Sequence, residues 1–166
     1  MLSTTVVLWV HIFGAIGWLG AAMAFGMVIG PSLLGMSPPA RTEFFAKVLP
    51  KFVRYVEGLS LLTIIFGVIT AVVVINGNFS LWTLSNNFQI LITTGAVLAL
   101  VAMIDGLAVV VPASRKVSSM SEQLLKTPGP PPPELLASVA KLRMGSMVSM
   151  ILLILTTIFM VAGVNL

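Results

Sequence analysis

The chain has 166 residues, of which 58% are apolar and only 8% are charged, and its mean hydropathy is +1.10. A soluble domain carries about 25% charged residues, so this composition excludes a water-soluble globular fold. The absence of cysteine excludes disulfides, thiolate metal sites, iron–sulfur clusters and a cysteine nucleophile. At about 20 apolar residues per crossing, the length allows four transmembrane helices and little else.

Four stretches without an acidic or basic residue are long enough to cross a bilayer, namely 6–30, 59–75, 88–104 and 144–165. Each is expected to be a helix, because an isolated span cannot otherwise pair its backbone groups in lipid. Flanking residues at helical spacing extend the expected helices to about 5–30, 42–76, 87–118 and 134–164. We therefore predict an all-α integral membrane protein with a single domain, 1–166, folded as an antiparallel four-transmembrane-helix bundle.

The basic residues fall in only two segments, between the first and second stretches and between the third and fourth. They are Arg41, Lys47, Lys51, Arg54, Arg115, Lys116, Lys126, Lys141 and Arg143. The positive-inside rule then places both termini and the connection 76–87 on the outer face of the cytoplasmic membrane. The net charge of +4 comes from basic residues that are expected to lie at the cytoplasmic surface of the membrane. It gives no reason to expect a nucleic-acid partner.

His11 is the only histidine and hence the only strong transition-metal ligand. At 1.5 Å per residue, it lies roughly 9 Å below the outer end of its helix. Met160 is the methionine nearest that level, at roughly 6 Å from the outer end. Each of the other three helices offers threonines at roughly 9 to 12 Å, namely Thr70, Thr93, Thr94, Thr156 and Thr157. The sequence thus predicts a polar layer in the outer half of the bundle.

One histidine without cysteine cannot supply the three or four protein ligands of a zinc site. A haem needs one or two axial ligands, which His11 and Met160, or His11 alone, would supply. The alternative is a histidine that is hydrogen-bonded to a threonine or to an interfacial water. The sequence contains no hydrolase constellation and no phosphate loop, and the apolar stretch below the threonine layer is not typical of a channel.

Two acidic residues, Glu57 and Asp105, lie about 26 to 28 Å from the outer ends, close to Arg54 and Arg143. Carboxylates within a membrane are functional candidates by default, here for proton entry or for orienting a basic partner. Ion pairing that fixes the ends of the bundle is the simpler expectation at this shallow depth.

Small residues recur in the first predicted helix as Gly14, Gly17 and Ala21. Residues at this spacing lie on one side of a helix and allow another helix to approach closely. We expect them to form a helix–helix contact.

The stretch LWVHIFGAIGWLGAAMAFGMVIGP, with His11, Trp18 and Gly20, resembles the first helix of the copper-resistance-D-like membrane proteins. The stretch LPKFVRYVEGLSLLTIIFGVITA, with Phe66 and Gly67, is similar to the second helix of that group. The related HemJ-type protoporphyrinogen oxidases share the four-helix plan and the histidine, which is taken to be a haem ligand. The resemblance implies a metal or haem at His11. Where both groups tend to carry a lysine in the third helix, this chain has Thr93 and Thr94.

The sequence and the resemblance together predict a small integral-membrane b-type haem protein that transfers electrons or belongs to a membrane redox complex. Expected partners are the lipid bilayer, a quinone or other membrane redox subunits, and a second copy of the chain. The predicted cofactor-binding residues are His11, Met160, Thr93, Thr94 and Trp18, with His11 and Met160 as the metal ligands. Two alternatives stay open: a copper-handling protein that binds Cu(I) through His11 and Met160, and a cofactor-free structural subunit.

Overall fold

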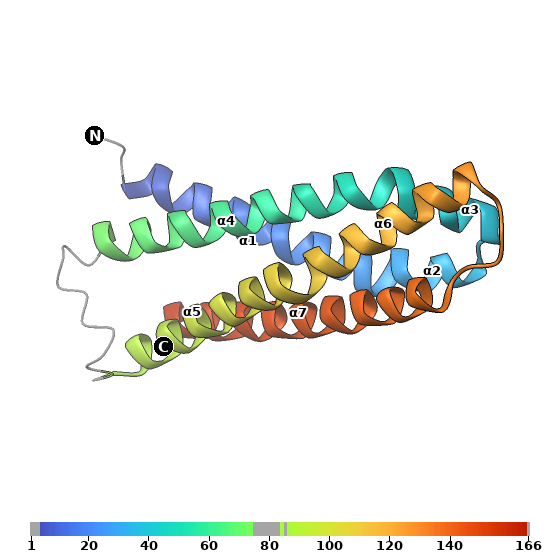
Figure 1. The fold of residues 1–166 in the computed structure, drawn as a ribbon. Coiled ribbons are helices and arrows are strands. Elements are labelled where there is room, and N and C mark those ends of the chain that lie inside the picture. Colours follow the sequence, from blue (N-terminus) through green and yellow to red (C-terminus); the bar gives the residue numbers. More distant parts are fainter. Residues whose placement is uncertain (1–3, 75–83, 85, 166) are drawn as a thin grey trace.

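The computed structural model describes residues 4–74, 84 and 86–165, and every regular element within them is a helix. Four long helical segments run along the molecule (Figure 1), namely Thr4–Gly35, Pro38–Val72, Asn87–Lys126 and Pro133–Val164. Each is long and apolar enough to cross a membrane. The prediction of an all-α fold with four apolar helices is therefore confirmed.

Three of the four segments are composite. The first joins α1 (Thr4–Met23), the π-helical stretch η1 (Ala24–Ile29) and α2 (Gly30–Gly35). The second joins α3 (Pro38–Glu43), η2 (Phe44–Val48) and α4 (Leu49–Val74). The third joins α5 (Asn87–Asp105), η3 (Gly106–Val110) and α6 (Val111–Lys126), and the fourth is the single helix α7 (Pro133–Asn165).

Each π-helical stretch precedes a proline by the same distance, with Pro31, Pro50 and Pro112 standing two residues after η1, η2 and η3. Proline has no N–H to donate and its ring clashes with the carbonyl four residues earlier. A wider turn before the proline relieves both problems, so the helix continues through it. This explains why the first helical segment runs to Gly35 although the sequence predicted an end near residue 30.

The helices associate as two close pairs, α1 with α4 and α5 with α7. Glycines permit both contacts. A β-carbon at Gly14 would lie 2.6 Å from Leu62 Cδ2, and one at Gly17 would lie 3.0 Å from Leu59 Cδ2. The predicted role of these two small residues in helix packing is confirmed.

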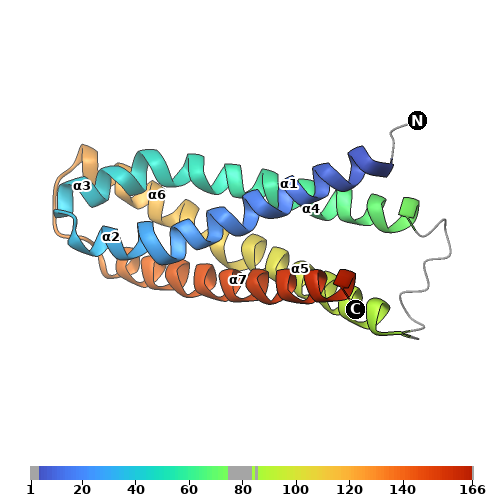
Figure 2. The ribbon, with the colours of Figure 1, turned by 180° about the vertical axis from the view of Figure 1, so that it is seen from behind.

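The two pairs converge at one end of the molecule and diverge at the other, where both chain termini lie (Figures 1 and 2). We call these the basic end and the termini end. At the basic end α6 packs between η2 and α7, and the largest apolar cluster, which includes Phe45, Leu49, Val117 and Leu142, holds these elements together.

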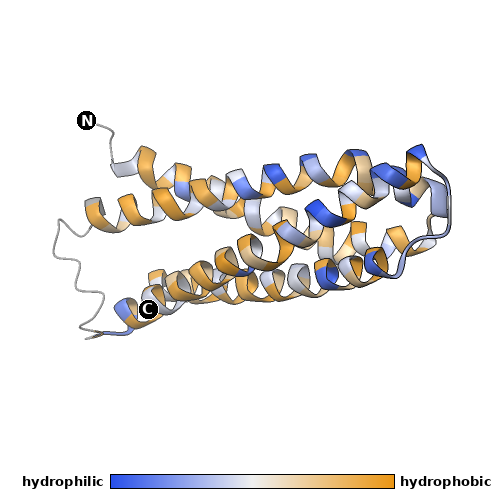
Figure 3. Cartoon of the chain, viewed as in Figure 1, coloured by the Kyte–Doolittle hydropathy of each residue, from blue (hydrophilic) through white to orange (hydrophobic). Residues whose placement is uncertain are grey.

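The surface of the bundle is more apolar than parts of its interior. Large apolar side chains such as Phe13 and Ile104 are at least 60% exposed, whereas Ser60, Thr63 and Thr156 are buried. Hydrophilic residues gather toward the basic end (Figure 3). An extensive apolar surface with polar groups inside is the arrangement expected for a protein surrounded by lipid.

Candidate functional site

The imidazole of His11 lies between α1 and α4. Its Nδ1 is 2.8 Å from the backbone carbonyl oxygen of Thr63. A carbonyl oxygen can only accept, so Nδ1 carries the proton and donates this hydrogen bond. In the neutral ring Nε2 is then the nitrogen with a free lone pair.

This orientation of the ring matters for ligand binding. Histidines that bind metals commonly donate their other N–H to a carbonyl or a carboxylate, which fixes the tautomer and the ring plane. The bond to Thr63 provides that support from a second helix. His11 can therefore offer Nε2 as a single ligand without any rearrangement of its tautomer.

Two glycines make room for the ring and for its partner. A β-carbon at Gly67 of α4 would lie 2.9 Å from Cε1 of His11, and one at Gly14 of α1 would lie 2.8 Å from Oγ1 of Thr63. The hydroxyl of Thr63 donates to the carbonyl of Leu59 at 2.7 Å. The ring of His11 thus sits on a surface built by Thr63 and Gly67.

The threonines of the predicted layer fall into two groups. The hydroxyls of Thr94 and Thr157 donate to carbonyls of their own helices, Ile90 at 2.7 Å and Leu153 at 2.9 Å. Five buried hydroxyls in the described part of the chain have no hydrogen-bond partner, and three of them belong to this layer, those of Thr70, Thr93 and Thr156. An unpartnered buried hydroxyl is destabilising, so these three are the ones that a ligand or water would satisfy.

Met160 lies in the other helix pair. Its Cγ and Cε pack over Gly95, at 2.8 Å and 3.4 Å from the position of a β-carbon there. The structure thus places His11 in the contact of α1 with α4 and Met160 in the contact of α5 with α7. It records no contact between the two predicted metal ligands in the described residues.

Trp18 is 4% exposed and packs with Ala102 and Leu153 in the core of the bundle. It also lines a cavity of about 70 Å³ between the four helical segments, to which His11 does not contribute. An engineered cavity of about 150 Å³ holds one benzene, so this cavity is too small for a haem. Trp18, which follows His11 by seven positions in the chain, therefore has a packing role in this structure.

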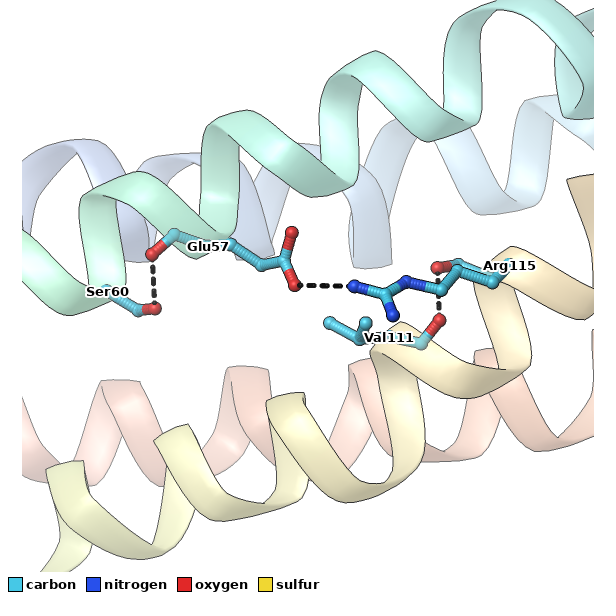
Figure 4. A network of polar contacts seen from close by, with 5 residues as sticks. Glu57, Ser60, Val111 and Arg115 are labelled. Carbon is cyan, nitrogen blue, oxygen red and sulfur yellow. Dashed lines mark hydrogen bonds and ion pairs between the residues drawn. The ribbon is translucent and has the colours of Figure 1, made fainter.

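The two carboxylates have different partners. Glu57, at the basic end of α4, lies 3.8 Å from Nη2 of Arg115 (Figure 4). Asp105, at the end of α5, accepts a hydrogen bond of 2.7 Å from Oγ of Ser149 on α7. The expected ion pairing near the basic end is thus observed for Glu57, with Arg115 in place of Arg54 or Arg143, whereas Asp105 pairs with a hydroxyl.

Among the described residues, no group of three or more His, Cys, Asp or Glu side chains lies close enough to hold a metal ion. Comparisons with models of protein families, with curated proteins and with solved structures find no match to this chain. The resemblance of the first two helices to the copper-resistance-D-like proteins therefore stays a prediction.

Sequence reasoning missed Thr63, which accepts the hydrogen bond from His11, and named Gly67 only as part of the resemblance. Thr63 and Ser60 share one face of α4 with Glu57, Gly67 and Thr70, at intervals of three or four residues. Such spacing of small and polar residues within an apolar helix is a readable signal. This face could have been found by plotting the polar residues by their angle around the helix axis as well as by their position along it.

Proposed function

We propose that this chain is an integral-membrane protein that binds one b-type haem through Nε2 of His11 and takes part in electron transfer within the membrane. The observation that carries the proposal is the hydrogen bond from Nδ1 of His11 to the carbonyl of Thr63. It gives the only histidine of the chain the orientation that haem-ligating and metal-ligating histidines have.

The single imidazole of His11 suits an axial ligand of haem better than it suits the site of a bare metal ion. One nitrogen suffices as an axial ligand of haem, whereas zinc needs three or four protein ligands. The unpartnered hydroxyls of Thr70, Thr93 and Thr156 could supply hydrogen bonds to the cofactor or to bound water. When bound, a b-type haem would supply reversible one-electron transfer, and its apolar surroundings would influence its potential.

The proposal includes a topology. The four helices form an antiparallel transmembrane bundle in the cytoplasmic membrane, with both termini outside and the basic end in the cytoplasm. The distribution of Lys and Arg supports this orientation, as does the location of both termini at the end away from the charged residues (Figures 1 and 3). A quinone or another membrane redox subunit would exchange electrons with the haem.

The test is a reduced-minus-oxidised optical spectrum of the protein purified from cells supplied with haem. We expect a Soret band and an α-band in the wild type, and their loss in His11→Ala and His11→Asn. The asparagine variant is the sharper comparison, because its amide nitrogen replaces Nδ1 and can still donate to the carbonyl of Thr63, but it leaves no nitrogen at the position of Nε2 to bind a haem. Size-exclusion profiles identical to the wild type serve as the folding control.

A featureless wild-type spectrum under these conditions would overturn the haem proposal. Binding of Cu(I) that depends on both His11 and Met160 would then indicate the copper-handling alternative. Bands that persist in both His11 variants would show that another residue holds the haem.

A further inference from the structure

One face of α4 carries a row of polar and small residues that runs from the basic end toward His11. Its members are Glu57, Ser60, Thr63, Gly67 and Thr70. Ser60 and Thr63 are both buried, at 6% and 4% exposure. Both hydroxyls donate within their own helix, Ser60 to the carbonyl of Glu57 at 2.9 Å and Thr63 to that of Leu59 at 2.7 Å, which satisfies their donors in the apolar interior.

A surface groove of about 320 Å³ lies between α4 and α6 at the basic end of this row. Charged and hydroxyl side chains line it, including Arg54, Glu57, Ser114, Arg115 and Glu122. The side chain of Arg115 is 77% exposed and that of Glu57 only 25%, so the arginine reaches from solvent toward a carboxylate set deeper in the bundle (Figure 4).

A cavity of about 70 Å³, lined by residues of all four helical segments, also borders the same carboxylate. Its wall is mostly apolar, but it includes four polar residues, namely Glu57, Ser60, Ser146 and Ser149. Glu57 and Val53 are the two residues that line both the groove and the cavity. Glu57 therefore stands at the boundary between solvent and the interior of the bundle.

The cavity has the size and the polar groups that buried water needs. A cavity needs at least about 10 to 15 Å³ on this measure to hold one water, and the water needs two to four polar partners, so the cavity is large enough for water. Ser60 donates to the carbonyl of Glu57 at 2.9 Å, and Ser149 donates to Asp105 at 2.7 Å. Both hydroxyl oxygens retain the capacity to accept a hydrogen bond from water.

We propose that Glu57 binds and releases protons at the mouth of a hydrated inlet, which leads from the groove between α4 and α6 to the cavity inside the bundle. The charged groups around Glu57 are Arg54 on its own helix, with Arg115 and Glu122 on α6. Across the cavity, α7 contributes Ser149, whose hydroxyl donates to Asp105 of α5. The residues of α1 that line the cavity are Trp18 and Ala22. The inlet leads protons from the basic end into the cavity between the helices, and it does not depend on a cofactor at His11.

The absence of cysteine makes the test direct, because one introduced thiol is the only thiol in the chain. Ser146→Cys places it in the cavity wall, and Met147→Cys places it one residue away on the exposed apolar surface. The full-length variants are reconstituted in lipid nanodiscs and treated with silver ions, which travel through water and bind thiolates. Thiols that remain free are counted with a maleimide after denaturation. We expect Ser146→Cys to be blocked at least about tenfold faster than Met147→Cys.

Two substitutions at Glu57 test separately whether water enters beside this residue and whether its carboxylate takes up a proton. In the Ser146→Cys background, Glu57→Leu should slow the reaction with silver to the rate of Met147→Cys, whereas Glu57→Gln should leave it fast. In the cysteine-free chain, Glu57→Gln should remove a protonated-carboxyl infrared band that appears as the pH falls and shifts at once in D₂O.

Equal rates for Ser146→Cys and Met147→Cys would show a dry cavity and overturn the proposal. A fast reaction that Glu57→Leu does not slow would place the water entrance elsewhere. An infrared titration that Glu57→Gln leaves unchanged would show that Glu57 takes up no proton.

Discussion

The ring of His11 lies directly over Gly67, at a distance that leaves no room for a side chain there. A β-carbon at position 67 would be 2.9 Å from Cε1 and 3.1 Å from Nδ1 of the imidazole. The same ring donates to the carbonyl of Thr63, one turn earlier in α4. The glycine and the carbonyl together fix both the position and the tautomer of the histidine.

Gly67→Ala should therefore destabilise the protein and displace His11. Overpacking of this kind costs about 1 to 3 kcal/mol, because the ring must move and its bond to Thr63 is strained. Thermal unfolding in detergent measures the change. If His11 holds a haem, the same variant should also lose absorbance in the Soret region.

Gly58→Ala is the matched control on the same helix, because a β-carbon there would meet nothing within 4 Å. It should leave stability unchanged or raise it by up to about 1 kcal/mol, since alanine favours the helix. Equal destabilisation by Gly58→Ala and Gly67→Ala would mean that the close approach of His11 is not the reason why position 67 requires glycine.

The fold was largely readable from the sequence, because length and hydropathy alone decide how many helices can span a bilayer. The composite segments were not. The first helix was expected to end near residue 30, but it continues through Pro31 to Gly35, although a proline interrupts the regular hydrogen-bond ladder. That a π-helical stretch before the proline would carry the helix onward depends on packing at the basic end, which periodicity does not reveal.

The candidate site was readable only in part. Counting residues from the helix ends predicts the levels of His11 and of the threonines, because the rise per residue is constant. It could not separate Thr93 from Thr94, since rotation about the helix axis decides which hydroxyl turns inward. Nor could depth show that Met160 packs on Gly95 in the other helix pair.

The hydrogen bond from Ser149 to Asp105 joins α7 to α5 near the basic end. Ser149→Ala should destabilise the protein by about 1 to 3 kcal/mol, because it leaves a half-buried carboxylate without its donor. Asp105→Asn should cost less, since the amide oxygen still accepts the bond. Ser119→Ala, which removes an exposed hydroxyl bonded to the carbonyl of Lys116, serves as the control in thermal unfolding. A loss at Ser119 as large as that at Ser149 would contradict this assignment.

Thr93→Val and Thr94→Val are nearly isosteric changes at adjacent positions of α5, and we expect opposite consequences. In cofactor-free protein Thr93→Val should stabilise by about 1 kcal/mol, because it removes a buried hydroxyl without a partner. Thr94→Val should bring no such gain, since the hydroxyl of Thr94 is bonded to Ile90. Unfolding in detergent distinguishes them. A destabilising Thr93→Val would reveal that bound water or a ligand satisfies its hydroxyl.

The proposed topology predicts that the two ends of the bundle meet different compartments. Thr4 lies at the termini end, and Gly129 lies in the connection between α6 and α7 at the basic end. In this cysteine-free chain, Thr4→Cys should react with a membrane-impermeant maleimide added to intact cells, and Gly129→Cys should react only after the membrane is opened. The reverse pattern would place the basic end outside, against the charge rule for membrane proteins. It would also place the groove beside Glu57 on the outer side, and the inlet would then draw its protons from outside the cell.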